Sequence, residues 1–252
     1  MKISPLLASL LVLGVATAGT APAALAASSS APAGFVPLFN GRDFTGWKLP
    51  EGDNGHWKVI NGVIDYDARS EATGDKNLWT EKEYKDFVLR IDWRIKETTG
   101  LYPVPTVLPD GTHKKGPDGK DIVTPTPNAD SGIYLRGTSK AQLNIWCWPI
   151  GSGEVYGYRM DKNMPTEVRA GVTPKVKADK PVGEWNTFEI TMKGDRLTVM
   201  LNGKKVIENA QLLNLPESGR LALQHHGGFK DGKYSPASSL VQFRNISIKE
   251  LK

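Results

Sequence analysis

The sequence of 252 residues contains a single cysteine, Cys147, so no intramolecular disulfide can form. A chain of this length can instead be stabilised by burial of a large core, in which Cys147 would pack as a small side chain. The four histidines show no spacing typical of a zinc site, and no glycine-rich phosphate-binding loop is present. The net charge is only +5, and no run of lysine and arginine marks a nucleic-acid surface. The sequence therefore predicts no metal, no cofactor and no nucleic-acid partner.

Apolar segments long enough to span a membrane as a helix are also missing. The apolar segment Leu6–Val15 follows Lys2 and is too short to cross a bilayer. Small residues follow it and end in Ala24–Ala26, which is typical of a signal peptide cleaved after Ala26. Cleavage after Ala18 is the alternative. We expect residues 1–26 to be a signal peptide, residues 27–34 a flexible leader, and the mature chain to be periplasmic or secreted without a membrane span.

Glycine and proline are abundant, with 26 and 17 residues, which favours many tight turns over a helical bundle. Three Asn-Gly pairs begin at Asn40, Asn61 and Asn202 and are the strongest short hairpin signal. Apolar residues alternate with charged ones from Phe87 to Ile95, which predicts a strand with one core face. The final strand, expected over residues 240–249, shifts its alternation near Arg244 and Asn245, which indicates a bulge.

Many short strands predict an all-β sandwich or barrel, with residues 35–252 as one domain. We expect only Thr80–Asp86 to form a helical turn, because Thr80 and Glu83 have the spacing of a capping box. Residues 97–128 contain six prolines, and no strand of usual length fits most of this stretch. We predict a long inserted loop there, which either covers a cleft or is a solvated insertion.

Several segments together resemble the 3-keto-disaccharide hydrolase domain family, long described only as a domain of unknown function. They occur in the family's order over about residues 35–251, nearly all of the mature chain. The matching segments are Leu38–Trp47 (LFNGRDFTGW), Asn77–Thr80 (NLWT), Tyr84–Phe87 (YKDF), Asp130–Arg136 (DSGIYLR), Gly183–Asn186 (GEWN), Leu201–Gly203 (LNG), Leu221–Gly227 (LALQHHG) and Phe243–Ile246 (FRNI).

The resemblance implies a concanavalin A-like jelly-roll β-sandwich of two curved antiparallel sheets, with a ligand cleft on the concave sheet. It also implies a carbohydrate partner and activity on glycosides oxidised at C3. The sequence departs from the family at Gln142 and Asn144, where the family often carries a Glu-x-Gln pair. The stretch 97–128 is also longer than in typical members.

The alternating residues Gln142, Asn144 and Trp146 would project to one face of a strand. Two amides and an aromatic ring are typical of a sugar-binding site. The amides form hydrogen bonds with sugar hydroxyl groups, and the indole packs against the C–H face of the sugar ring. Asp130 and Tyr156 complete the expected substrate-binding set. The alternative for Trp146 and the nearby Trp148 is that both are ordinary core aromatics.

His226, Glu154 and Arg136 are the predicted catalytic residues. Adjacent strand residues face opposite ways, so only one of His225 and His226 can enter a cleft, and His226 matches the family's His-Gly. Glu154 follows a flexible turn and would lie at a cleft rim, and Arg136 ends a strand. The alternatives are a structural histidine, a solvated surface glutamate and an ordinary salt bridge.

A ketone at C3 acidifies the C2 proton, so the glycosidic bond can break by proton abstraction and elimination. This route needs one base and a donor for the developing oxyanion, not the two facing carboxylates of ordinary glycosidases. The sequence therefore predicts an exported enzyme that cleaves 3-keto-glycosides by hydrolysis or elimination. The alternatives are a lectin-like carbohydrate-binding module and a structural surface domain, and the oligomeric state is not predicted.

Overall fold

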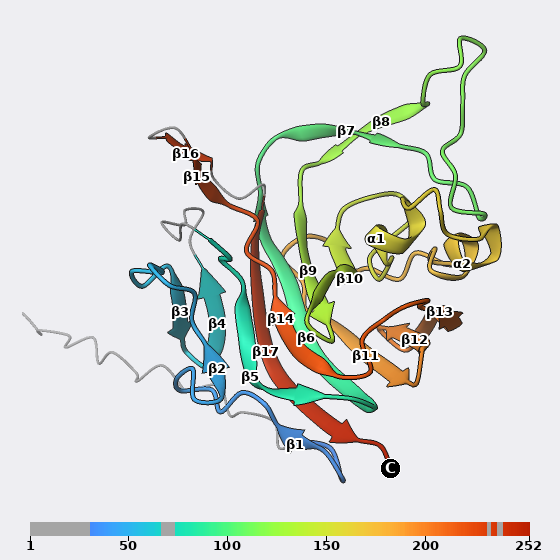
Figure 1. The fold of residues 1–252 in the computed structure, drawn as a ribbon. Coiled ribbons are helices and arrows are strands. Elements are labelled where there is room, and N and C mark those ends of the chain that lie inside the picture. The colour runs from blue at the N-terminus through green and yellow to red at the C-terminus, as the bar shows by residue number, and fades with distance from the viewer. Residues whose placement is uncertain (1–30, 67–73, 231–232, 236–238) are drawn as a thin grey trace, which may run out of the picture.

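The computed structural model describes residues 31–66, 74–230, 233–235 and 239–252. The predicted signal peptide lies outside these residues. The chain folds as an all-β jelly-roll sandwich of two antiparallel sheets, as predicted (Figure 1). Among the described residues, no helix has the length and apolar character needed to cross a membrane.

The larger sheet has eight strands in the order β13-β12-β11-β6-β17-β4-β3, with β1 paired to β17. Its bounds are β1 (Val36–Pro37), β3 (Trp57–Ile60), β4 (Val63–Tyr66), β6 (Phe87–Thr98), β11 (Asn186–Lys193), β12 (Arg196–Leu201), β13 (Lys204–Gln211) and β17 (Ser239–Glu250). The smaller sheet has five strands in the order β10-β9-β14-β5-β2. Its bounds are β2 (Trp47–Lys48), β5 (Leu78–Tyr84), β9 (Asp130–Leu135), β10 (Thr138–Trp146) and β14 (Gly219–Leu223).

The core lies between the sheets and is built by strict alternation of side chains. On β6 the residues from Phe87 to Ile95 alternate between buried apolar and more exposed polar positions, which confirms the sequence pattern. β17 breaks its register between Arg244 and Ser247, with Asn245 at φ 51°, which confirms the expected bulge. Two Asn-Gly pairs form the predicted hairpins, because Asn61 and Asn202 both adopt positive φ ahead of their glycines.

Three local predictions are wrong. Thr80–Asp86 is not a helical turn, because β5 continues to Tyr84 and the Thr80 hydroxyl donates to the carbonyl of Lys82. Asn40-Gly41 joins no pair of strands; the Asn40 side chain instead accepts the backbone N–H groups of Arg42 and Asp43. Two short helices, α1 (Tyr156–Arg159) and α2 (Thr166–Gly171), lie where none was expected.

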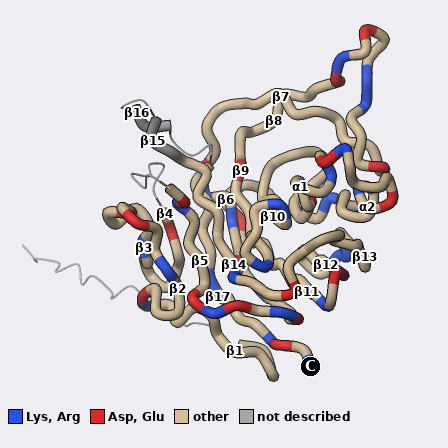
Figure 2. The backbone as a smooth tube through the Cα atoms, viewed as in Figure 1, with Lys and Arg blue, Asp and Glu red and all other residues tan. Residues whose placement is uncertain are grey.

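The stretch expected to be a loop forms a ribbon, called here the arm (residues 99–128). It contains the antiparallel pair β7 (Leu101–Pro105) and β8 (Val123–Pro127) and connects β6 of the larger sheet to β9 of the smaller one. The arm arches away from the sandwich, and part of its distal loop returns beside α1 and α2 (Figure 1). Figure 2 shows that β7 and β8 carry no charge, whereas the distal loop carries both signs. A second small ribbon, β15 (Gly228–Lys230) with β16 (Lys233–Ser235), follows His226.

Candidate functional site

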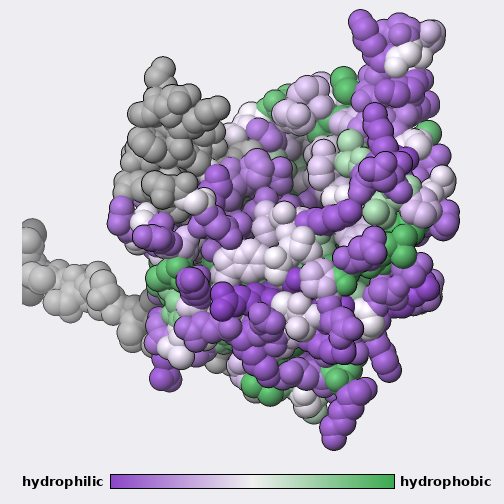
Figure 3. Space-filling view, in the orientation of Figure 1, coloured by the Kyte–Doolittle hydropathy of each residue, from purple (hydrophilic) through white to green (hydrophobic). Residues whose placement is uncertain are grey.

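The outer face of the five-stranded sheet carries a band of amides and aromatic rings, called here the polar face. Side chains at alternate positions of β14, β9 and β10 enter the core, and the others point outward. The polar face comprises these outward side chains: Lys48, Asn77, Trp79, Arg220, Gln224, His226, Asp130, Tyr134, Gln142, Asn144 and Trp146. Figure 3 shows a pale, near-neutral area in the middle of the molecular surface, surrounded by hydrophilic residues.

The strand register aligns these residues in rows across the sheet. Trp79 lies opposite both Lys48 and Ala222, Ala222 lies opposite Tyr134, and Tyr134 lies opposite Gln142. Because alanine is small, the rings of Trp79 and Tyr134 approach each other over it, with centroids 5.8 Å apart. The row therefore places an aromatic pair between a cation at one edge and an amide at the other.

Three amide side chains of the polar face, Gln142, Asn144 and Gln224, form a hydrogen-bonded network. The Gln142 Nε2 donates to Asn144 Oδ1 at 2.6 Å and to Gln224 Oε1 at 2.8 Å. Gln224 in turn donates to the Tyr134 hydroxyl at 3.1 Å, and burial raises the pKa of that hydroxyl. The predicted pair Gln142 and Asn144 thus lies on one face, and the network fixes its orientation.

Gly132 makes room for this network. A Cβ at this position would lie 2.7 Å from Gln142 Nε2 and 2.7 Å from the carbonyl oxygen of Leu143. Such contacts are too short for any side chain, so only glycine lets Gln142 cross β9 toward Gln224.

His226 and Asp130 meet at the end of the polar face. The His226 Nε2 lies 3.1 Å from Asp130 Oδ2, and the two side chains are 44% and 38% exposed. Burial raises the pKa of the Asp130 carboxyl, and His226 opposes that shift. His225 faces the other way: it is buried, its ring lies 4.3 Å from that of Tyr66, and its Nδ1 accepts the N–H of Gly227. The structure thus exposes His226 and packs His225 into the core.

Trp146 lies at the far edge of the face but is not itself an open plate. Only 4% of it is exposed, and Trp148 stacks on it with ring centroids 3.9 Å apart. Its indole N–H donates to the carbonyl of Gly151, which fixes the ring. Tyr156, exposed on α1, meets Trp146 edge-on at 6.2 Å. The half-buried Trp148, not Trp146, presents the aromatic surface at this edge.

Glu154 does not lie at a cleft rim, and this prediction is corrected. Its side chain is fully buried and forms an ion pair with Arg159 of α1, which is also fully buried. Burial raises the pKa of Glu154 to about 7, although the Arg159 guanidinium opposes the shift. Arg159 also donates to the carbonyl of Gly111 and contacts His113 Nε2 at 3.0 Å, so the pair holds the arm rather than a substrate.

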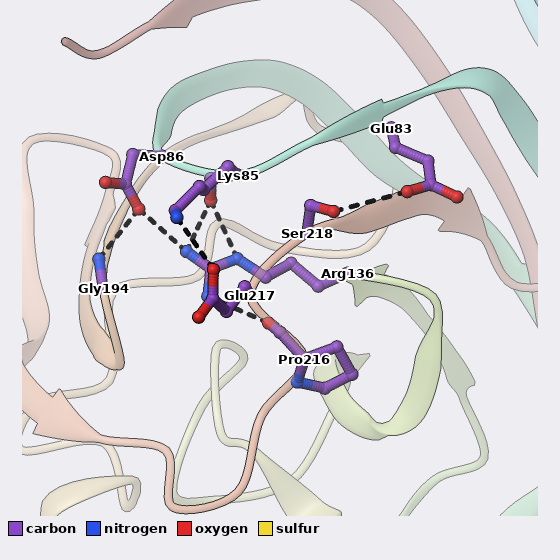
Figure 4. A network of polar contacts seen from close by, with 8 residues as sticks. All are labelled: Glu83, Lys85, Asp86, Arg136, Gly194, Pro216, Glu217 and Ser218. Carbon is purple, nitrogen blue, oxygen red and sulfur yellow. Dashed lines mark hydrogen bonds and ion pairs between the residues drawn. The ribbon is translucent and has the colours of Figure 1, made fainter.

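Arg136 is likewise structural. Its side chain is 2% exposed and donates to the carbonyls of Lys85 and Pro216 and to Asp86 Oδ1 (Figure 4). The predicted catalytic role of Arg136 is therefore corrected to the alternative, a salt bridge, because its donors bond backbone carbonyls and the Asp86 carboxylate. Arg136 instead fixes the segment at Pro216, which forms one wall of a groove.

That groove is a cavity of about 770 Å³ that continues the polar face beyond Trp79. Its lining includes Lys48, Asp75, Trp79 and Arg220. The polar face therefore extends from this groove at one end to the His226–Asp130 pair at the other. Within the part of the chain that the structure describes, no group of three or more His, Cys, Asp and Glu side chains could hold a metal ion.

The family model of the 3-keto-alpha-glucoside-1,2-lyase-like domain matches residues 34–249. The chain belongs to this family. A 3-keto-disaccharide hydrolase of Bacteroides thetaiotaomicron is 22% identical over 185 residues, which are 69% of this chain and 58% of that protein. The chain thus spans little more than half the length of this curated relative.

Solved structures agree with the family at the level of the fold. A structure described as a glycosyl hydrolase from Parabacteroides distasonis has 20% identity and a TM-score of 0.52, over 87% of this chain and 84% of that one. A second from the same species has 23% identity and a TM-score of 0.48, over 87% and 94%. The family match therefore makes this chain a 3-keto-alpha-glucoside-1,2-lyase-like domain.

Sequence reasoning missed six residues of this lyase-like domain's polar face. Two of them, Lys48 and Arg220, lie just outside the segments that carry the family resemblance, and the other four are Asn77, Trp79, Tyr134 and Gln224. All four lie inside the segments that carry the family resemblance. Tyr134 and Gln224 each occupy an outward position next to core residues, Ile133 and Leu223. The period-two pattern of those segments was the signal that could have found them.

Proposed function

We propose that the domain cleaves 3-keto-glycosides by removing the C2 proton and eliminating the anomeric oxygen. Family membership supports the substrate class, and the His226–Asp130 pair on an open face carries the proposal. A partly exposed histidine oriented by a carboxylate is the usual arrangement of a general base.

In this proposal each nitrogen of His226 has its own role. Nε2 faces Asp130, so it holds the proton in the hydrogen bond, and Nδ1 carries the free lone pair. Nδ1 takes the C2 proton, and the C–H electrons move toward the C3 carbonyl to give an enediolate. The amide groups of Gln224 and Asn144 and the Tyr134 hydroxyl are the donors on the same face for the oxygen that gains charge.

Collapse of the enediolate breaks the C1–O bond, and the leaving oxygen takes up a proton. The sugar product then contains a C1–C2 double bond, and addition of water across this bond gives net hydrolysis. Ordinary glycosidases need two facing carboxylates. Glu154 is enclosed with Arg159, so it is not available as the second carboxylate beside Asp130.

A lectin-like module is the second candidate function. The observation that favours it is the amide network, in which Gln142 stands where the family often has a carboxylate. Amides and aromatic rings recognise sugar hydroxyls and ring faces without any turnover.

Aglycone release from 3-keto-glucosides and their unoxidised parents tests the proposal. His226→Ala should lower kcat about 10²–10⁴-fold, with the fold retained. In D₂O the wild type should exchange the C2 proton of a 3-keto sugar, and His226→Ala should not. Lys204→Gln, an exposed change on β13 of the other sheet, is the matched control. Sugar binding without release or exchange in the wild type would support the lectin instead.

We also propose that the mature domain is exported after cleavage behind Ala26. The apolar segment and small-residue site in the first 26 residues support this. Mass spectrometry of the exported protein should find Ala27 at its N-terminus, and a terminus at Met1 would contradict the proposal.

A further inference from the structure

The polar face extends beyond the part that the reacting sugar ring would occupy. Arg220 and His226 are six residues apart along one chain segment, which corresponds to roughly 20 Å of extended strand. The proposed chemistry occupies the His226 end. The groove of about 770 Å³ at the Arg220 end is open to the rest of the substrate.

Two cations line this groove and have no side-chain partner among the residues that the structure describes. Lys48 and Arg220 are exposed, and neither side chain makes a hydrogen bond or ion pair with any of the described residues. The register places Lys48 directly beside Trp79, and Arg220 precedes Ala222, the other cross-strand neighbour of Trp79, by two residues. The ring of Trp79 is therefore flanked by free cations from β2 and β14.

The lining also holds three carboxylates, which keep their charge but form no ion pair with these two cations. Asp75 accepts hydrogen bonds from the Trp79 indole and from Asn77. Glu83 accepts the Ser218 hydroxyl (Figure 4). It is also the cross-strand neighbour of Arg220, but the two side chains form no ion pair. Glu51 is the remaining exposed acid of the lining. Among the described residues, Lys48 and Arg220 thus keep hydrogen-bond donors that no carboxylate of the lining takes up.

Hydrogen bonds also hold the ring and the wall of the groove in place. Asp75 fixes the Trp79 ring through its indole N–H, so one ring face is held toward the groove. The wall at Pro216–Gly219 is anchored by the buried Arg136 guanidinium, which bonds Pro216 on one side and Asp86 on the other (Figure 4). A fixed aromatic plate with flanking cations is suited to a ring that carries a negative charge.

We propose that this groove is a second subsite that binds the anionic part of the substrate, a sugar or aglycone ring bearing a carboxylate, sulfate or phosphate. Trp79 stacks on the ring, and Lys48 and Arg220 bind the anion. The assignment of this ring as the leaving group rests on the proposed function, but anion binding in the groove does not depend on turnover.

Calorimetric titration of the full chain with three probes tests the subsite: phenyl glucoside, phenyl glucuronide and phenyl glucoside 6-phosphate. The wild type should bind both anionic probes at least tenfold more tightly than the neutral one. Lys48→Gln and Arg220→Gln should each remove about tenfold of that preference, which is about 1.4 kcal/mol, because each variant loses a charged donor for the anion. Neutral binding should change less than twofold, and Lys204→Gln should change nothing.

Equal affinity of the wild type for neutral and anionic probes, or no binding of any probe, would overturn the subsite. A preference for only one of the two anionic probes would identify the substituent. The anion subsite and the proposed removal of the C2 proton can be refuted independently of each other. His226→Ala should keep the anion preference, while Lys48→Gln should keep C2 proton exchange on a neutral 3-keto-glucoside. Circular dichroism of each variant excludes loss of fold as the cause.

Discussion

Replacing Glu154 by glutamine should release the arm as well as destabilise the sandwich. The carboxylate and the Arg159 guanidinium are both fully buried, and removal of one partner leaves a buried charge. Such a change costs about 3–5 kcal/mol. At about 2–4 °C per kcal/mol for a domain of this size, the expected fall in Tm is about 6–20 °C.

Arg159 also binds Gly111 and His113 of the arm, so its reorganisation should reach the distal loop. Differential scanning calorimetry measures the loss of stability, and hydrogen exchange measures faster opening of the backbone amides at residues 106–114. Glu189→Gln is the control, because the Glu189–Arg90 pair is about half exposed with a 4.0 Å separation. Its cost should stay below about 1 kcal/mol. A Glu154→Gln protein as stable as that control, with unchanged arm amides, would refute the reasoning.

Two further predictions concern the polar face. Gly132→Ala should cost about 1–3 kcal/mol and weaken sugar binding, because the new Cβ meets Gln142 and the Leu143 carbonyl at 2.7 Å. Gly74→Ala, with nothing within 4 Å of its Cβ, should leave thermal melting unchanged and is the stability control. His225→Ala should lose about 3 kcal/mol of stability by emptying a packed ring site, whereas His226→Ala should stay within about 0.5 kcal/mol in the same melts. The opposite order would mean that the two histidines have been assigned the wrong way round.

The sheets and hairpins were predictable because they depend on local patterns. Alternation on β6 and positive φ at Asn61 and Asn202 act within a few residues, and the structure confirms them. Thr80 shows the limit of local reasoning, since its capping-box spacing was overridden by pairing of β5 with β14. The bond from Leu221 N–H to the Thr80 hydroxyl joins residues 141 positions apart, which no spacing rule detects.

The site residues also divide into those that a local pattern could place and those that it could not. Gln142 and Asn144 could be placed on one face from their spacing alone, and His226 from its opposition to His225. Glu154 and Arg136 were misplaced because burial depends on distant partners, Arg159 with the arm in one case and Lys85 with Pro216 in the other. A charged side chain in a sequence does not reveal whether solvent or an ion pair surrounds it.

The arm also divides the chain into two interleaved halves. A cut in its exposed distal loop, at residues 117–120, would separate β1–β7 from β8–β17. In the larger sheet, β17 of the second half lies between β6 and β4 of the first. In the smaller sheet, the seam runs between β5 and β14, so Trp79 comes from one fragment and Gln224 from the other. A nicked protein would therefore stay assembled, and the two fragments, expressed separately, would form a complementation pair whose polar face exists only after they associate.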